Sequence, residues 1–213
     1  MSQLADLSIQ IFDCEQGTPE WFDCRKGIPT SSEFSTVMAK GKDGGASITR
    51  AKYMRQLAGE IHTGEPAPEG YTNAFMDRGH ELENEARTLY AFMKDAEPRR
   101  VGFVKNGRAG CSPDSLIGER SGLEIKVAIP AVQIERLQRN DLPPEHKAQV
   151  QGSMWVTNRP TWEFMSYCPK MPPLLLTIQR EDEYIANLVR SVTAFTEELD
   201  MMVAWLKQLQ GRA

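Results

Sequence analysis

The feature that most constrains the fold is a change of pattern near residue 95. Downstream of it, three short, partly alternating runs at 99–105, 109–117 and 122–128 are separated by Asn106-Gly107 and by the turn-forming residues 119–122. Period-two runs joined by tight turns predict consecutive strands in an antiparallel meander. Upstream, a long amphipathic helix is predicted over about 73–94, because apolar residues recur there at helical spacing: Phe75, Leu82, Ala86, Leu89 and Phe92.

Helices are predicted on both sides of this strand region. Thr18-Pro19 starts a short helix, Thr30 to Glu33 reads as a capping box that opens a helix through Met38, and Thr49 caps a helix to about His62. Loops are expected at 40–47 and 64–70, helices at 130–139, from 144 and over 180–210, and strands at 162–167 and 174–179. The sequence therefore predicts one α/β domain over 1–213, with a central mixed β-sheet flanked by helices.

Composition limits the class of protein. The chain has 213 residues, 40% hydrophobic and 25% charged, which is an ordinary globular mixture. No apolar run approaches the roughly 20 residues that a membrane-spanning helix needs, and the first ten residues lack a basic and apolar leader. We therefore expect a cytoplasmic protein with no membrane contact.

Soft metal sites are not indicated. The cysteines form no C-x-x-C pair and are expected to be reduced thiols, and the histidines lack the spacing of a transition-metal site: Cys14, Cys24, Cys111, Cys168, His62, His80 and His146. A hard cation bound by oxygen atoms remains compatible with the sequence.

Positive charge is concentrated in one segment of an acidic chain. The formal net charge is -4, but residues 25–55 carry seven basic and two acidic side chains: Arg25, Lys26, Lys40, Lys42, Arg50, Lys52, Arg55, Glu33 and Asp43. A local excess of positive charge suits a groove that holds a polyanion such as DNA. A solvated loop rich in lysine is an equally good reading of this feature alone.

The segment most informative about chemistry is Asp114 followed by Glu124-Ile125-Lys126. Alternation along a strand places Glu124 and Lys126 on one face and Ile125 on the other. An antiparallel turn at residues 119–122 brings Asp114 near Glu124. Two neighbouring buried carboxylates repel each other unless a cation lies between them, and Mg²⁺ or Mn²⁺ accepts carboxylate oxygens and substrate phosphates. Lys126 would then lower the pKa of an attacking water or stabilise the transition state.

Five ordered blocks carry a resemblance to a known family. They read E-W-x-x-C-R-x-G-I-P-T-S-S-E from Glu20, R-G-H-E-L-E-N-E-A-R from Arg78, C-S-P-D-S-L-I-G from Cys111, G-L-E-I-K from Gly122 and A-Q-V-Q-G-S-M-W-V-T from Ala148. In this order and spacing, over roughly 18–170, the chain resembles the phage lambda exonuclease family of YqaJ-type viral recombinases. These belong to the PD-(D/E)XK nucleases, so the resemblance implies a restriction-endonuclease-like core.

The resemblance implies roles for individual residues. Metal ligation falls to Asp114, Glu124, the Ile125 carbonyl and Glu83, with two Mg²⁺ ions per site for which Mn²⁺ can substitute. Lys126 activates the water. Gln149 lies beside the metals in the same implied set.

A pocket for the 5′-phosphate is implied at Arg25, Ser32 and Ser112, whose guanidinium and hydroxyl groups suit phosphate. Simpler readings of single residues stay open. Glu83 can be a solvated helix residue, Gln149 a helix-surface amide, Ser32 a plain helix cap, and Arg25 the partner of Asp23 or Glu20 in an exposed ion pair. Trp21 and Trp155 are expected to be core aromatics.

Two departures from the family concern neighbours of the site. Ser115 stands where a glycine usually follows the aspartate, and Val127-Ala128 replaces a more frequent Cys-Pro after the lysine. Neither is an implied ligand. The departures therefore bear on turn geometry and leave the implied metal ligands intact.

The implied activity is a Mg²⁺-dependent 5′–3′ exonuclease that acts on linear double-stranded DNA ends, releases 5′-mononucleotides and leaves a 3′ overhang for phage-type recombination. The family forms a ring-shaped homotrimer and works with a single-strand annealing protein, so we expect this chain to do the same. The resemblance also implies that the protein is encoded by a phage or prophage. Two alternatives stay open. The chain can be a noncatalytic DNA-end-binding module that partners an annealing protein, or a restriction-like endonuclease, although no base-reading motif is visible.

Overall fold

The computed structural model describes residues 9–41, 44–45, 47–67 and 74–211, with side chains from residue 81 onward in the last range. The elements follow in the order β1 (Gln10–Phe12), α1 (Pro19–Arg25), a 3-10 helix η1 (Ser31–Glu33), α2 (Phe34–Met38), α3 (Ile48–Thr63), α4 (Ala74–Lys94), β2 (Pro98–Arg99), β3 (Phe103–Asn106), β4 (Ala109–Cys111), β5 (Ser115–Ile117), β6 (Ser121–Val127), α5 (Pro130–Arg139), α6 (Pro144–Thr157), β7 (Thr161–Tyr167), β8 (Leu174–Gln179) and α7 (Asp182–Gln210).

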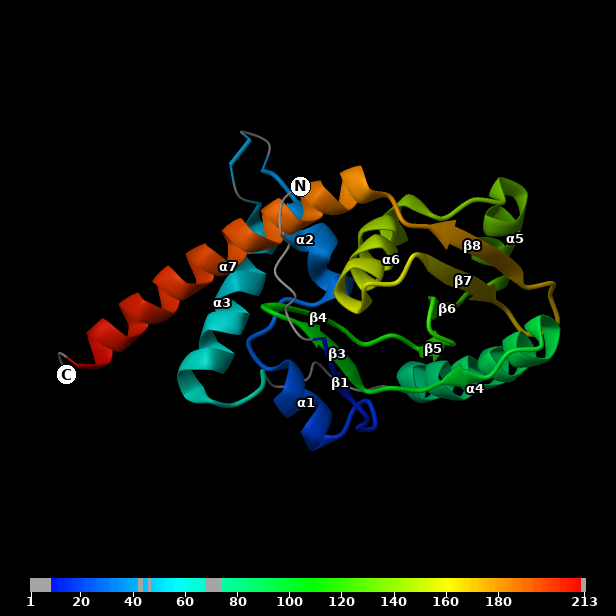
Figure 1. Cartoon of the computed structure of the whole chain (residues 1–213), viewed down its shortest axis with the longest axis horizontal. Helices are drawn as coiled ribbons and strands as arrows, with labels where there is room; N and C mark the ends of the chain where they lie inside the picture. Colours follow the sequence, from blue (N-terminus) through cyan, green and yellow to red (C-terminus); the bar gives the residue numbers. More distant parts are fainter. Residues whose placement is uncertain (1–8, 42–43, 46, 68–73, 212–213) are drawn as a thin grey trace.

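A five-stranded mixed sheet forms the centre of the molecule (Figure 1). Its order is β2-β5-β6-β7-β8. Strands β6 and β7 run parallel, because α5 and α6 carry the chain back between them, whereas the other neighbouring pairs are antiparallel. Strands β1, β3 and β4 form a separate antiparallel sheet. The predicted fold class, a mixed sheet flanked by helices, is confirmed.

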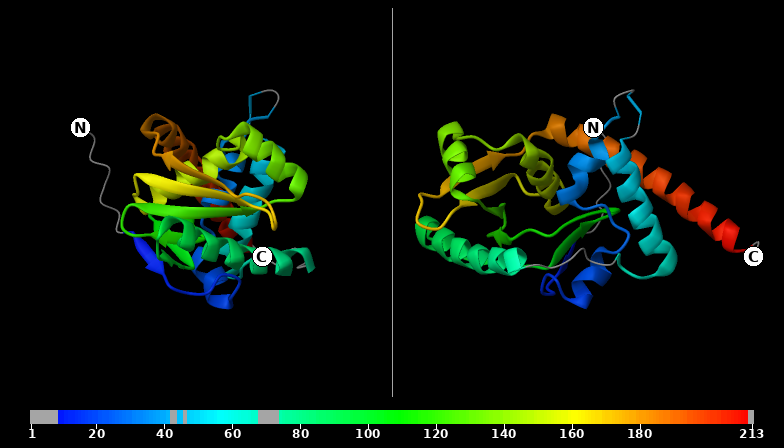
Figure 2. Two further views of the ribbon diagram at one scale, coloured as in Figure 1. Left: turned by 90° about the vertical axis from the view of Figure 1, so that its right-hand side faces the viewer. Right: turned by 180° about the vertical axis from the view of Figure 1, so that it is seen from behind.

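Helices cover both faces of the five-stranded sheet, with α4 on one face and α5 and α6 on the other (Figure 2). Leu123 and Ile125 of β6 pack with Ala86 and Tyr90 of α4 in a small apolar cluster. Because side chains alternate along a strand, Glu124 points to the opposite face. The predicted orientation of Ile125, away from Glu124 and Lys126, is therefore confirmed.

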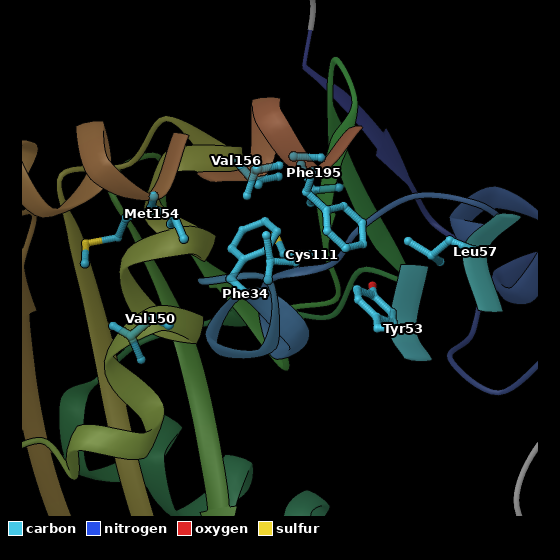
Figure 3. Packing of buried hydrophobic residues seen from close by; sticks show 14 of the residues in the cluster. Phe34, Tyr53, Leu57, Cys111, Val150, Met154, Val156 and Phe195 are labelled. Atoms are coloured by element: carbon cyan, nitrogen blue, oxygen red, sulfur yellow. The ribbon is translucent and has the colours of Figure 1, made fainter. Parts of the chain in front are cut away.

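The larger apolar core joins α2, α3, α6 and α7 to the strands (Figure 3). Phe34 has no exposed surface and lies against Trp155, with ring centroids 5.7 Å apart. Full burial of such a side chain stabilises the fold by about 1.5–3 kcal/mol. Phe195 of α7 stacks on Tyr53 of α3 with centroids 5.7 Å apart, which fixes the long C-terminal helix to the body.

Two predicted strands are each divided in the structure. The run 99–105 contains β2 and β3, the run 109–117 contains β4 and β5, and in both cases the two parts belong to different sheets. Pro113 lies at the second break, where its fixed φ and missing N–H end the ladder. Both predicted hairpins form, since β3 pairs with β4 and β5 with β6. The prediction of one continuous antiparallel meander was wrong, because the strands belong to two sheets.

Helix starts differ from the prediction in their capping. Thr18 caps α1 as predicted, because its Oγ1 accepts the Trp21 N–H at 3.4 Å. Thr30 makes no side-chain capping bond, and its hydroxyl lies 3.1 Å from Ser32 Oγ, so the predicted capping box was wrong. Ser47, rather than Thr49, caps α3.

The amphipathic pattern of α4 holds with one exception. Ala86 is buried and Leu82 and Leu89 are partly buried, but Phe92 is 85% exposed and Tyr90 takes the buried position. Asn73, the predicted start, and the side chain of Phe75 lie outside the described residues, as do parts of the predicted loops 40–47 and 64–70.

The region predicted as a long or once-broken helix after residue 180 is one continuous helix, α7. Within the described part of the chain, no helix combines the length and apolar character that crossing a membrane requires.

Gly122 is required where β6 passes Trp162 of β7. A Cβ at this position would lie 2.3 Å from the nearest indole carbon. We expect Gly122→Ala to destabilise the fold by about 1–3 kcal/mol because the fully buried ring cannot move aside. Urea unfolding measures this loss.

Gly59→Ala is the matched control, because its new Cβ would meet nothing within 4 Å on helix α3. There the change should be neutral or stabilising by up to about 1 kcal/mol. Equal effects at the two glycines would contradict the close approach of Gly122 to Trp162.

Candidate active site

The β5–β6 hairpin brings two carboxylates together. Ser115 pairs with Leu123 in the ladder, so Asp114 comes to lie opposite Glu124. The Asp114 Oδ2 atom accepts the N–H of Ile125 at 2.5 Å. Glu124 is 3% exposed, whereas Asp114 retains some contact with solvent. The hairpin turn predicted from sequence therefore places the acids side by side.

Two side-chain donors converge on Glu124. Lys126 Nζ lies 2.6 Å from Glu124 Oε1, and Gln149 Nε2 of α6 donates to the same oxygen at 2.7 Å. Lys126 reaches it along the strand and Gln149 from the helix above. The structure thus gathers Asp114, Glu124, Lys126 and Gln149 at one place on the sheet.

The charges in this cluster are strongly coupled. Burial raises the pKa of Asp114 well above its usual range, and the charges of Glu124 and Glu83 raise it further. Burial likewise raises the pKa of Glu124, although Lys126 opposes the shift. Burial alone would lower the pKa of Lys126, but Glu124, Asp114 and Glu83 together raise it. The lysine is therefore held as a cation beside acids that resist ionisation.

Glu83 belongs to the same electrostatic cluster. It lies on α4 with its side chain 26% exposed and forms an ion pair with Arg87 one turn later. Its charge contributes to the raised pKa values of Asp114 and Glu124. The open reading of Glu83 as a freely solvated residue was wrong. Arg87 was not predicted to belong to the site, although its position four residues after Glu83 is the spacing of a helical ion pair.

The donor set fits a hard divalent cation. Three acidic side chains, Asp114, Glu124 and Glu83, stand against only two basic ones, Lys126 and Arg87, so ionising all three acids would leave an excess of negative charge. Donors among the described residues use one oxygen each of Asp114 and Glu124, namely Oδ2 and Oε1. No group of three or more His, Cys, Asp and Glu among those residues could hold an ion alone. Mg²⁺ commonly binds one or two carboxylates and retains waters.

His146 was not predicted to lie near the site. It is one turn before Gln149 on α6, and Arg136 of α5 donates to its Nε2 at 3.2 Å. Burial, with the charges of Lys126 and Arg136, lowers the pKa of His146 to about 4. The imidazole is therefore neutral near pH 7 and adds no charge to the cluster.

A second group of residues lines a cavity of about 520 Å³ between α1, η1 and α3. Its lining includes Arg25, Lys26 and Lys52 together with Ser32 and Glu60. Arg25 stacks over Trp21, 4.0 Å from the ring centroid, and burial lowers its pKa. The lining thus carries three basic side chains against two acidic ones, Glu33 and Glu60, and the hydroxyl of Ser32.

Ser112 connects the cavity to the carboxylates. Trp21 lines the cavity, and its Nε1 donates to Ser112 Oγ at 2.9 Å and to the Gly102 carbonyl at 3.0 Å. Ser112 precedes Asp114 by two residues. Of the predicted phosphate residues, Arg25 and Ser32 thus line the cavity together with Trp21, whereas Ser112 does not line it and is joined to it through the Trp21 N–H.

Several readings of this region need correction. Trp21 lines the cavity, so the prediction of a core aromatic was wrong, whereas Trp155 packs against the core as predicted. The exposed ion pair of α1 is Lys26 with Asp23 at 3.1 Å and does not involve Arg25. Ser32 lies within a 3-10 helix of three residues and caps neither this helix nor α2, so its reading as a plain helix cap was wrong.

The basic segment 25–55 divides in the structure. Arg25, Lys26 and Lys52 line the cavity. Arg50 instead is 9% exposed and forms a two-bond ion pair with Glu198 of α7 at 2.7 and 2.8 Å. Lys42 and Asp43 lie outside the described residues. A part of the predicted positive charge is therefore structural.

The four cysteines are free thiols, as predicted. Cys14 and Cys24 approach to 4.0 Å between their sulfur atoms. Burial raises the pKa of Cys24 to about 12, which keeps it protonated.

Two proteins of known structure that are similar to this chain are described as exonucleases. An alkaline exonuclease from Laribacter hongkongensis, LHK-Exo, is 32% identical with a TM-score of 0.81, over 92% of this chain and 99% of that one. Its complex with dAMP gives a TM-score of 0.82 at the same identity and coverage. A phage-related exonuclease from Haemophilus somnus 129PT, 17% identical with a TM-score of 0.65 over 84% of this chain and 96% of that one, shares the fold.

Sequence comparison agrees with these structures. The Escherichia coli K12 protein ExoD is 39% identical over 62 residues, which are 28% of this chain and 71% of that protein. Residues 20–160 match the family described as the YqaJ-like viral recombinase domain, and this range contains the carboxylate cluster and most of the cavity lining. The chain therefore belongs to the YqaJ-like viral recombinase family.

Proposed function

We propose that the chain is a Mg²⁺-dependent exonuclease that degrades linear double-stranded DNA from the 5′ end and leaves a 3′ single strand for recombination by annealing. The observation that carries the proposal is the cluster in which Lys126 Nζ lies 2.6 Å from Glu124 while Asp114 accepts the Ile125 N–H at 2.5 Å. Membership of a viral recombinase family and likeness to an alkaline exonuclease support a nuclease role in recombination.

The residues that would hold Mg²⁺ are Asp114, Glu124 and the carbonyl of Ile125, with Glu83 supporting a second ion or its waters. Mn²⁺ offers similar coordination and is expected to substitute. The bound cation would neutralise phosphate oxygens and lower the pKa of a water molecule. Burial raises the pKa of both Asp114 and Glu124, which supports the assignment because a bound cation would stabilise their ionised forms.

Lys126 and Gln149 complete the reaction site. Glu124 holds the Lys126 ammonium beside the proposed cation site, so its charge would stabilise negative charge that develops on a phosphate bound there in the transition state. Gln149 donates to Glu124 and fixes the direction of that carboxylate. Both residues act from the face of the sheet that α6 covers.

The cavity at α1 would hold the terminal 5′-phosphate through Arg25, Ser32 and Ser112. A guanidinium with a pKa lowered by burial still carries its charge at neutral pH, and it offers paired donors to phosphate oxygens. Holding this terminus next to Asp114 would set the 5′–3′ polarity and release mononucleotides. The dAMP complex of LHK-Exo supports a nucleoside monophosphate as the product class.

We further propose a cytoplasmic homotrimer that encloses duplex DNA and works with a single-strand annealing protein, with a phage or prophage as the source. This proposal rests on family membership.

Two alternatives predict different behaviour. A noncatalytic DNA-end-binding module would bind DNA with strong salt dependence and leave it intact. A restriction-like endonuclease would cut closed circular DNA as well as linear DNA.

The first test compares linear duplexes with 5′-phosphate and 5′-hydroxyl ends in Mg²⁺. We expect faster digestion of the phosphorylated duplex and no digestion in EDTA. Arg25→Ala should reduce the preference for phosphate about 10- to 100-fold, because a hydrogen bond to a charged group contributes about 1.5–3 kcal/mol. Arg108→Ala is the control, since Arg108 pairs with Asp200 on the surface. Equal digestion of both ends by the wild type would contradict the phosphate pocket.

The second test removes the ammonium group. Lys126→Ala should reduce kcat by at least about 100-fold, as the loss of one transition-state donor does in other enzymes, while DNA binding persists. Lys147→Ala serves as the control because Lys147 pairs with Glu181 at the surface, 2.7 Å away. Rapid-quench assays of a labelled duplex measure both rates. Full activity of Lys126→Ala would remove this residue from the mechanism.

The third test uses the raised pKa of Asp114. The pKa of Asp114 is higher in the folded protein than its value of about 3.9 in the unfolded chain. The metal-free protein therefore loses stability as the pH rises from the unfolded-state pKa to the folded-state pKa. Asp114→Asn should therefore be more stable than the wild type in EDTA at pH 8, and the difference should shrink at pH 5.

Urea unfolding in EDTA and in Mg²⁺ measures this effect. Mg²⁺ should stabilise the wild type, because a ligand that binds the folded state shifts the equilibrium, and it should stabilise Asp114→Asn much less. A wild type that gains no stability from Mg²⁺ would contradict a metal site at Asp114.

A further inference from the structure

Arg87 is a buried arginine that connects helix α4 to strand β5, which begins directly after Asp114. It is 8% exposed. Its Nε donates to Ser115 Oγ at 3.0 Å, its Nη1 donates to Asn84 Oδ1 at 2.6 Å, and its Nη2 forms the ion pair with Glu83. All three nitrogen atoms of the guanidinium are therefore engaged, one across the interface with β5 and two along the helix.

Ser115 carries this connection to Asp114. The Ser115 side chain has no exposed surface, and its hydroxyl donates to the Asp114 carbonyl at 2.6 Å. The Ser115 hydroxyl oxygen thus accepts a hydrogen bond from Arg87, and the same hydroxyl donates one to the backbone carbonyl of Asp114. A glycine at position 115 would offer Arg87 no side-chain acceptor.

We propose that Arg87 is a positioning residue that holds Glu83 and the Asp114 backbone in a fixed relation across the α4–β5 interface. The inference rests on the proposed metal-dependent nuclease function. Glu83 alone is a flexible side chain on a helix surface, and one guanidinium that grips both it and Ser115 restricts its rotamers. The planar fork of arginine contacts several acceptors at fixed angles, which the single ammonium of lysine cannot do.

A purely structural role would give a different pattern. If Arg87 only stabilised the fold, its removal would lower the free energy of unfolding and leave metal affinity unchanged. If it positions Glu83 and Asp114, metal affinity falls even in the fraction that is folded. Arg50 is the matched control, because it is equally buried at 9% exposure and pairs with Glu198 on a different part of the molecule.

The experiment measures Mn²⁺ and Mg²⁺ binding by calorimetry in the absence of DNA, together with the Mg²⁺ concentration for half-maximal digestion. Arg87→Ala should weaken metal binding about 10- to 100-fold, the usual effect of removing a partner that orients a metal ligand. Arg87→Lys should restore little of it. Arg50→Ala should lose stability while its metal affinity stays at the wild-type value.

Ser115→Ala tests the same connection if Arg87→Ala does not fold. It should weaken metal binding in the same direction, and the double variant should bind no more weakly than Arg87→Ala alone, because the two residues act through one contact. Additive losses would overturn the connection through Ser115.

Two outcomes separate this inference from the proposed function. Wild-type metal affinity in Arg87→Ala or Ser115→Ala, with a wild type that binds metal and digests DNA, would overturn the positioning role alone. A wild type that binds no divalent cation would overturn the nuclease proposal and this inference together.

Discussion

The site depends on two acidic side chains that the β5–β6 hairpin holds side by side. Glu124 is 3% exposed and lies beside Asp114, and burial raises the pKa of both. Such an arrangement is unfavourable without compensation, so the surrounding elements are built to hold it. Arg159 fixes the hairpin turn by donating to the Gly118 carbonyl at 2.8 Å and the Ser121 carbonyl at 2.5 Å. The hydrogen bonds of Arg159 thus fix the turn that lies between the two acids in the chain.

Features set by nearest neighbours in the chain could be predicted from sequence. Alternation along 122–128 was enough to place Glu124 and Lys126 on one face and Ile125 on the other, because the period of a strand is fixed by its backbone. The turn before Gly122 was enough to bring Asp114 opposite Glu124, since a short hairpin determines its own register.

Features set by distant residues could not be predicted. Trp21 was wrongly predicted to be a core residue. The cavity that it lines is formed by α1, η1 and α3, which come together only in the folded protein. The break within 109–117 depends on β4 and β5 joining different sheets. The contact of Arg87 with Ser115 spans 28 positions in the chain. Phe92 follows the helical period yet is 85% exposed, because Tyr90 occupies the place against the sheet.

The break between β4 and β5 also sets the spacing between the cavity lined by Trp21 and the carboxylates. Ser112 directly follows β4 of the smaller sheet, and its Oγ accepts the Trp21 Nε1–H at 2.9 Å. Asp114 directly precedes β5 of the larger sheet. Two residues of extended chain span at most about 7 Å, and Pro113 between them removes a rotatable φ. The cavity that Trp21 lines and the carboxylates are therefore connected by a short, stiff segment. This link passes from one sheet to the other, so neither sheet alone could fix the spacing.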